Sequence, residues 1–341
     1  MINKIANFTR MKSSDNIHTN KLNPGISFEE IDRAISKSGY PLQTVIADKL
    51  RSNFDCQEEW SFIDYQTNEL RSLDIIAKRY LYNVNEKNVH VRPSLNLLIE
   101  CKQSELPYVF FLSPEKIKTY HYPLISGLYH KQIKVSTNDE LSTTTYPISA
   151  ALDLQEDEFV LQTAPSSMTF SKCVRTGKAI ALSGTESFQG LVLPLLKSMQ
   201  YFNESKTPLR LKPYSDACLT LGIAVIDGPM IGVNVDNGGH SSELMPWIRV
   251  FRHESYKGKD EFEREKLLAI DVVHKDFFDQ FIHEHVYPYA MRFSTKVLKH
   301  QDVIINGKAF AKEIGKNWWS EIEPRLQKKT ITNSIFKRFK K

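Results

Sequence analysis

Three apolar runs of strand length follow one another: RSLDIIA at residues 71–77, LNLLIECKQ at 95–103 and PYVFFL at 107–112. Runs of this length, bounded by polar or proline-containing segments, are typical of buried strands. Asp74, Glu100 and Lys102 stand where a core strand would carry apolar side chains. A buried carboxylate is costly unless something pairs with it, so this exception to the pattern is where we look for function.

Glu100 and Lys102 share one face of their expected strand. Side chains alternate across a strand, so the Cα atoms of these two residues lie about 7 Å apart on one face while Ile99 and Cys101 point into the core. If the strand that carries Asp74 is a neighbour, two carboxylates and one ammonium group converge. Two hard oxygen ligands and water suit Mg²⁺ or Mn²⁺. A nearby lysine can orient an attacking water or balance charge on a phosphate, so the constellation fits metal-assisted phosphodiester hydrolysis.

This arrangement resembles the active-site motif of a known nuclease superfamily. Asp74, a gap of 25 residues and then Glu100-Cys101-Lys102 are similar to the Asp…(Asp/Glu)-x-Lys motif of the PD-(D/E)xK nucleases, which share the restriction-endonuclease-like fold. A helix expected at about 41–53 and a strand expected around 60–65 precede the two motif strands, as in that fold. The segment GYPL at 39–42 and the sequel ECKQS at 100–104 resemble the branch related to Mrr.

The resemblance implies an α/β fold in which helices flank a restriction-endonuclease-like mixed β-sheet, with one long insertion. It implies Asp74, Glu100 and Lys102 as the catalytic residues. It also implies Mg²⁺ (or Mn²⁺) as the cofactor, held by Asp74, Glu100 and the backbone carbonyl of Cys101.

Three further residues are expected to support the metal ligands: Gln103, and Gln43 and Asp48 on the first helix of the motif region. Related sequences often carry a glutamate on this helix. Here the matching position is Gln43, with Asp48 one turn further on. The sequence therefore does not decide whether the site binds one metal ion or two.

The expected activity is that of a Mg²⁺-dependent endonuclease acting on DNA, with double-stranded DNA as partner and a role in restriction, phage defence or repair. Many enzymes of this class act as homodimers, and the sequence leaves the oligomeric state open. It also leaves RNA open as a substrate.

Two alternatives remain at this point. Asp74 could form a structural ion pair with Arg71 or Lys102 at a sheet edge. The fold could also serve without its chemistry, as a catalytically inactive DNA-binding or regulatory module. The bare Glu-x-Lys pattern is weak evidence, because a second copy occurs at Glu204-Ser205-Lys206 in a polar stretch.

The composition of the chain limits the class of protein to which it can belong. The 341 residues are 41% hydrophobic and 25% charged, with a net charge of +5, values that are ordinary for a globular protein and compatible with nucleic acid as partner. The four cysteines are scattered without a Cys-x-x-Cys motif, which favours a reducing cytoplasm over a zinc site or a disulfide framework. The N-terminus has no signal-peptide pattern, and no apolar run approaches the roughly 20 residues that a membrane span needs.

The chain is expected to divide into a flexible N-terminus (1–23), a nuclease-like domain (24–324) with an insertion at about 113–185, and a basic tail (325–341). Ser27 and Glu30 have the spacing of a helix capping box. The sequence DGP at 227–229 interrupts an apolar stretch and predicts a β-hairpin.

Five cations are candidates for nucleic-acid contacts: Arg71, Arg79 and Arg92 around the motif strands, and Lys337 and Arg338 in the tail. A solvated loop and a frayed terminus are the alternatives for these segments. Arg249 and Arg252 lie on an expected strand, where we expect core packing with exposed arginines.

Overall fold

The computed structural model describes residues 15–86, 88–137, 143–161, 164–206, 214–255, 265–311 and 321–328. Twelve strands form one large sheet: β1 (Asp55–Ile63), β2 (Leu70–Tyr80), β3 (Val91–Gln103), β4 (Tyr108–Leu112), β5 (Leu124–Ser126), β8 (Ser166–Thr176), β9 (Ala179–Ser183), β10 (Ser215–Asp227), β11 (Met230–Asp236), β12 (Gly239–Leu244), β13 (Trp247–Ser255) and β14 (Glu265–His274).

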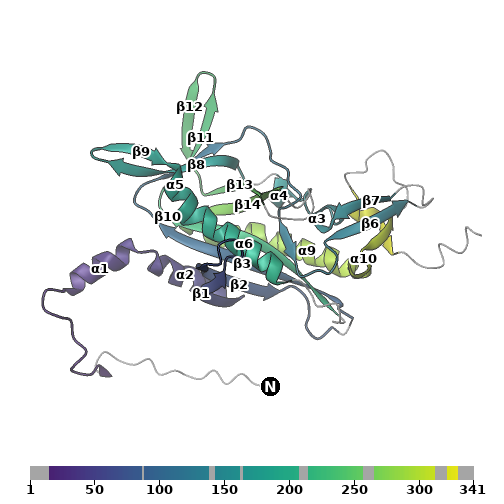
Figure 1. Cartoon of the computed structure of the whole chain (residues 1–341), viewed down its shortest axis with the longest axis horizontal. Helices are drawn as coiled ribbons and strands as arrows, with labels where there is room; N and C mark the ends of the chain where they lie inside the picture. The colour runs from purple at the N-terminus through teal and green to yellow at the C-terminus, as the bar shows by residue number, and fades with distance from the viewer. Residues whose placement is uncertain are drawn as a thin grey trace, which may run out of the picture.

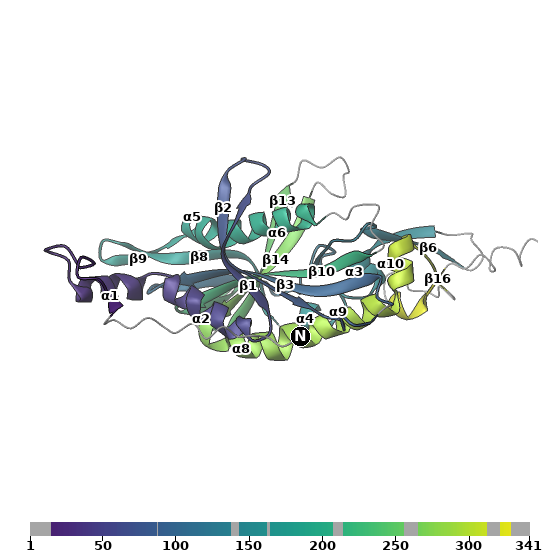
Figure 2. The same ribbon diagram turned by 90° about the horizontal axis from the view of Figure 1, so that it is seen from below.

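The strand order in this sheet is β1-β2-β3-β10-β14-β13-β8-β4-β11-β12, with β5 beside β10 and β9 beside β8. Parallel and antiparallel pairs are mixed, and helices lie on both faces (Figures 1 and 2). The prediction of an α/β fold with a mixed sheet flanked by helices is therefore confirmed. The α-helices are α1 (Phe28–Lys37), α2 (Tyr40–Arg51), α3 (Ile148–Ala151), α4 (Glu158–Leu161), α5 (Gly184–Ser187), α6 (Leu193–Ser205), α8 (Phe278–Gln280), α9 (Tyr287–Lys299) and α10 (Gln301–Asn306).

Helix α1 begins at the predicted capping box. The Ser27 hydroxyl accepts the backbone N–H of Glu30 at 3.2 Å, and the Glu30 carboxylate accepts the backbone N–H of Ser27 at 3.0 Å. Two amide donors that a helix start leaves unpaired are thus satisfied. Helix α2 follows after Gly39 and packs Leu42 and Ile46 into the core.

The sheet separates two apolar clusters. Leu97 and Ile99 of β3 belong to the cluster beneath α2 and α9, whereas Leu98 belongs to the cluster beneath α6. Figure 2 shows α6 on one face of the sheet and α9 on the other. Because successive side chains alternate, β3 is buried on both faces over most of its length, and this explains its nearly continuous apolar sequence.

Strands β3 and β10 run in parallel along their whole length. Val91 lies opposite Ser215 at one end of the pair, and Gln103 lies opposite Asp227 at the other. Their continuations β4 and β11 also pair in parallel. Two chain segments far apart in sequence, β3–β4 and β10–β11, are therefore paired in parallel within the sheet.

The predicted hairpin at residues 227–229 is wrong. The backbone N–H of Ser104 donates to the carbonyl of Asp227 at 2.9 Å, and that of Tyr108 donates to the carbonyl of Pro229 at 2.9 Å. A Cβ atom on Gly228 would lie 2.2 Å from the Ser104 carbonyl oxygen. The bend after β10 thus packs closely against the bend after β3, and β10 and β11 each pair with other strands.

The expected insertion at 113–185 is only partly separate from the core. It contributes β5, β8 and β9 to the large sheet, and β8 lies between β4 and β13. Its remaining strands join a second, four-stranded sheet with the order β16-β15-β6-β7, built from β6 (Gln132–Thr137), β7 (Thr143–Pro147), β15 (Lys308–Ala311) and β16 (Leu326–Lys328). The described start of the expected basic tail is therefore a paired strand.

Arg249 is not exposed, in contrast to the expectation from the sequence. It is 2% exposed and pairs with Asp271, which is fully buried, at 2.9 Å. Asp271 also accepts hydrogen bonds from the Tyr122 hydroxyl at 2.7 Å and the Trp247 indole at 2.9 Å. The ion pair is tolerated in the core because these polar atoms satisfy one another.

None of the described helices combines the length and the apolar character that a membrane crossing requires.

Candidate active site

Asp74 and the Glu100–Lys102 segment lie on adjacent antiparallel strands, as the sequence predicted. The register of β2 and β3 ends with Ile75 opposite Ile99. One further position along each strand sets Asp74 opposite Glu100. The two carboxylates therefore meet where β2 separates from β3.

The side chain of Asp74 takes the place of the next backbone hydrogen bond between β2 and β3. Its Oδ2 accepts the backbone N–H of Cys101 at 2.6 Å. The N–H and C=O of one strand residue point to the same edge, so the Cys101 carbonyl also faces the edge that β2 has left. The Cys101 thiol is buried in the apolar cluster on the α2 side, and burial raises its pKa.

Glu100 is buried with one oxygen bound and the other without a partner. Its Oε1 pairs with the Lys102 ammonium at 2.6 Å. Among the described residues, Glu100 Oε2 has no hydrogen-bond partner. Burial, followed by the negative charge of Asp74, raises the pKa of Glu100 to about 7, although Lys102 and the nearby backbone N–H of Asp74 oppose this shift. That N–H does not meet the geometry of a hydrogen bond to Oε2.

The other two charges of the cluster respond to the same environment. Burial raises the pKa of Asp74, and the charge of Glu59 raises it further. The hydrogen bond from the Cys101 N–H and the charge of Lys102 act in the opposite direction and lower this pKa. Burial disfavours the Lys102 ammonium, but the charges of Glu100 and Asp74 outweigh that effect and raise its pKa. Lys102 therefore remains a cation at neutral pH.

Of the three residues expected to support the ligands, one contacts a motif residue. The Gln43 side chain is buried and donates from Nε2 to the backbone carbonyl of Asp74 at 3.1 Å. Asp48 lies on the exposed side of α2 and pairs with Arg51. Gln103 donates to the Ser36 carbonyl at 2.6 Å and so ties β3 to the end of α1.

Glu59 is a residue near the site that sequence reasoning missed. The register of β1 and β2 is continuous at this point, with Glu58 opposite Ile75 and Trp60 opposite Leu73, so Glu59 lies opposite Asp74, on which its charge acts. The φ of +50° at Glu59 does not shift this register. Sequence reasoning missed Glu59 because it did not establish how β1 pairs with β2.

Arg71, three residues before Asp74, is held by carboxylates of its own hairpin. It pairs with Asp64 at 2.8 Å and with Glu69 at 3.1 Å. The expected ion pair between Arg71 and Asp74 is thus replaced by other partners. Lys337 and Arg338 lie outside the described residues.

Arg79 and Arg92 lie away from the site. Arg79 follows Asp74 by five residues in β2, a distance of roughly 17 Å along the strand. Arg92 precedes Lys102 by ten residues in β3, roughly 33 Å away, and it pairs with Asp216. Both residues belong to the motif strands and not to the polar excursion between them. Their contact with nucleic acid stays a prediction.

The donor atoms fit a divalent cation. Asp74 and Glu100 offer carboxylate oxygens, and the buried Glu100 Oε2 without a partner is the kind of atom that a bound ion would satisfy. Within the described ranges, no three His, Cys, Asp or Glu side chains converge on one point. Two carboxylates, a backbone carbonyl and water would be the available ligands, a set that Mg²⁺ accepts because it retains several waters.

Glu100→Gln is expected to change how stability depends on pH. In the fold the pKa of Glu100 is raised from 4.5 to about 7. Between these values the unfolded chain releases the proton and the folded chain keeps it, so the free energy of unfolding falls as pH rises. In Glu100→Gln the titrating carboxyl group is absent, so the free energy of unfolding falls less as pH rises. With a chelator present, Tm of Glu100→Gln relative to wild type should be higher at pH 8 than at pH 5.

The exposed Glu204, in the second Glu-x-Lys sequence, provides the control. Glu204→Gln should show the pH dependence of the wild-type protein. Parallel curves of Tm against pH for wild type and Glu100→Gln would contradict the raised pKa.

The site thus unites two adjacent carboxylates, one lysine and a buried oxygen that lacks a partner. Comparison with known proteins gives no further guide to it: no family model, no curated protein and no solved structure matches the chain.

Proposed function

We propose that the chain is a metal-dependent nuclease that hydrolyses phosphodiester bonds in DNA. The observation that carries the proposal is the meeting of Asp74 and Glu100 beside Lys102, with Glu100 Oε2 buried and without a partner among the described residues. Two converging carboxylates repel phosphates, and a divalent cation between them would reverse that effect.

The order of elements supports a restriction-endonuclease-like fold. Helix α2 is followed by the antiparallel strands β1, β2 and β3, and after a long intervening segment α6 leads into β10, which is parallel to β3. Helix α2 covers one face of this unit and α6 the other. The order from α2 to β3 is the one that the resemblance of the motif to PD-(D/E)xK nucleases led us to expect.

In the proposed mechanism, Asp74 and Glu100 would hold Mg²⁺ or Mn²⁺, and the Cys101 carbonyl lies on the same strand edge. A bound cation supplies Lewis-acid polarisation of the phosphate and lowers the pKa of water. Lys102 stays protonated, so it stabilises the negative charge that develops on the phosphate oxygens and does not act as a base. Gln43 fixes the backbone of Asp74 and so positions its carboxylate.

Double-stranded DNA is the substrate that the motif favours, and a homodimer would present one site to each strand. All four cysteines are free thiols, which supports the reducing cytoplasm expected from their spacing. A role in restriction, phage defence or repair belongs to the same proposal.

An inactive nuclease-fold module that binds DNA is the second candidate. The observation that favours it is the Lys102–Glu100 ion pair, which neutralises one carboxylate without any cation. A cleavage assay separates the two candidates. Plasmid, linear duplex, single strands and RNA are incubated with Mg²⁺ or Mn²⁺ and with chelator. Cutting that the chelator abolishes supports the enzyme, whereas DNA retention without cutting in either metal supports the module.

Addition of Mg²⁺ or Mn²⁺ is expected to raise Tm at pH 8 and much less at pH 5. A cation that binds only the folded chain stabilises it by mass action, and its binding needs the ionised form of Glu100. Differential scanning fluorimetry with a Ca²⁺ series as comparison measures the shift. The shift should vanish in Glu100→Gln and persist in Glu204→Gln. An equal shift in both variants would refute a cation site at Glu100.

A further inference from the structure

A cavity lies away from the carboxylate pair, between the large sheet and the small one. Its volume is about 170 Å³, and it is lined by the segment 120–132, the start of α3, Asn203 of α6, and Lys266 and Leu268 of β14. Strand β5 in its wall pairs with β10 at Thr220. Lys102 lies opposite Ile226, six residues further along β10, so the two sites are separated by roughly 20 Å along the strand.

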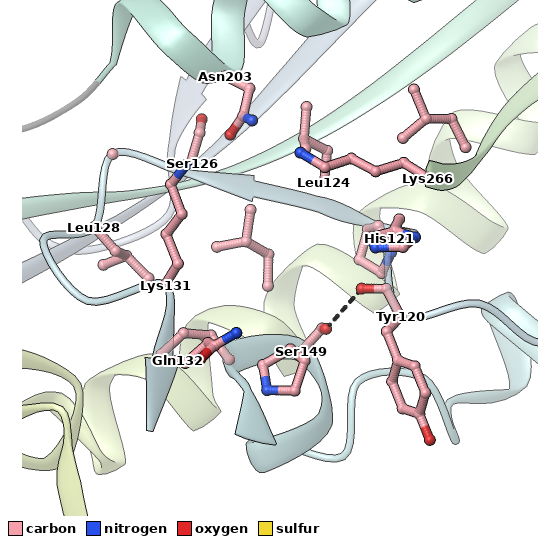
Figure 3. Close-up of a pocket in the computed structure, with 16 residues that line it drawn as sticks. Tyr120, His121, Leu124, Ser126, Leu128, Lys131, Gln132, Ser149, Asn203 and Lys266 are labelled. Carbon is pink, nitrogen blue, oxygen red and sulfur yellow. Dashed lines mark hydrogen bonds between the residues drawn. The ribbon is translucent and has the colours of Figure 1, made fainter. Parts of the chain in front are cut away.

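The polar lining of this cavity is cationic. Lys131 and Lys266 both contribute to it, and no Asp or Glu is present among its described lining residues. Figure 3 shows the two lysine side chains extending into the cavity from opposite sides, with Asn203 and Ser126 near their ends. Within the described part of the chain, Lys131 forms no ion pair. A lining in which the described residues include two lysines and no carboxylate attracts an anion.

The hydroxyl of Ser126 points to a missing partner. Ser126 is 4% exposed, and among the described residues its Oγ has no hydrogen-bond partner. Buried hydroxyl groups in folded proteins are nearly always paired. By contrast, Ser149 on the opposite wall donates to the Tyr120 carbonyl at 3.2 Å and accepts from Gln155 at 3.1 Å.

His121 supplies a neutral donor. Its Nδ1 accepts the backbone N–H of Leu267 at 3.3 Å, so the ring proton of the neutral form resides on Nε2. Burial, together with the charge of Lys266, lowers the pKa of His121 and keeps the ring neutral at pH 7. The cavity therefore combines two cations with neutral N–H and O–H donors.

From these groups we infer that the cavity binds a small phosphate monoester. A phosphate dianion has three terminal oxygens and can use both lysines and the hydroxyl, amide and imidazole donors at once, which a single carboxylate cannot do. Leu128, Ile148 and Leu268 form an apolar wall for the carbon part of the ligand. The cavity is smaller than the roughly 300 Å³ of typical pockets for drug-sized ligands, so the organic part has only a few carbon atoms.

Isothermal titration calorimetry of the full chain tests this inference. The probes are glycerol 3-phosphate, inorganic phosphate, and glycerol as the uncharged control. We expect saturable binding of glycerol 3-phosphate at one site per chain, weaker binding of inorganic phosphate, and no heat from glycerol. Lys131→Gln and Lys266→Gln should each weaken the binding of glycerol 3-phosphate about tenfold or more, the effect of losing a charged hydrogen bond.

Two further variants make the test specific. Lys134→Gln removes an exposed charge from β6 outside the cavity and should leave the affinity unchanged. Ser126→Ala should weaken binding without lowering Tm, because the hydroxyl gives up no bond within the described chain. The inference is overturned if neither phosphate binds saturably at millimolar concentration, or if Lys134→Gln weakens binding as much as Lys131→Gln does.

Discussion

Lys102→Met and Glu100→Gln are each expected to lower the rate of DNA cleavage by at least about 10²–10³-fold. In the proposed site, Glu100→Gln would remove the charge of a metal ligand, and Lys102→Met would remove the cation that stabilises the developing charge on the phosphate. Single-turnover cleavage of a labelled duplex, with Mg²⁺ at saturation, measures the effect. Substrate binding should fall much less than the rate, because the losses concern the transition state.

The matched control is the second Glu-x-Lys sequence of the chain. Lys206→Met alters an exposed lysine at the end of α6, 5.1 Å from the centre of the Phe202 ring, and should retain the wild-type rate. Asp74→Asn is preferable to Asp74→Ala, because the amide oxygen can still accept the Cys101 N–H and so preserve the local strand geometry. Wild-type cleavage by Lys102→Met and Glu100→Gln would exclude this site as the catalytic centre.

Asp271→Asn and Arg249→Met are expected to destabilise the fold by about 3–5 kcal/mol each. Each substitution leaves the other charge of a fully buried pair without its counterion. Arg249 also donates to the carbonyls of Phe159 at 2.8 Å and Val160 at 2.9 Å, which ties β13 to α4. Urea unfolding, followed by circular dichroism, measures the free energy of unfolding.

A surface pair and a double variant complete this experiment. Lys49→Gln removes the exposed Lys49–Asp279 pair and should cost less than about 1 kcal/mol. Arg249→Met combined with Asp271→Leu should cost less than the sum of the two single changes, because neither charge is then left alone in the core. A loss below about 1 kcal/mol in Asp271→Asn would show that Arg249 does not depend on this partner.

Local patterns in the sequence predicted the parts of the molecule that depend on local interactions. The capping box at Ser27 forms as expected, and the apolar runs around Asp74 and Glu100 become adjacent strands. The meeting of Asp74 and Glu100 was expected on the condition that their two strands are neighbours, and the pairing of β2 with β3 meets that condition.

Features that depend on distant partners were not predictable. The burial of Arg249 on β13 rests on Asp271 of β14 and on Tyr122, so three separate segments have to come together. Nothing in the sequence around Asp227 reveals that its segment pairs with the bend after β3, so a hairpin was the natural expectation. Glu59 lies opposite Asp74 through the pairing of β1 with β2, a register that the sequence analysis did not establish.

The parallel pairing of β3 with β10 has a consequence for synthesis of the chain. Strand β10 begins at Ser215, 112 residues after Gln103 ends β3 (215 − 103). At about 5–20 residues per second, the ribosome needs roughly 6–20 s to deliver the second neighbour of the strand that bears Glu100. Until then the edge of β3 that later pairs with β10 is open, although β2 can already pair with the opposite edge and bring Asp74 to Glu100.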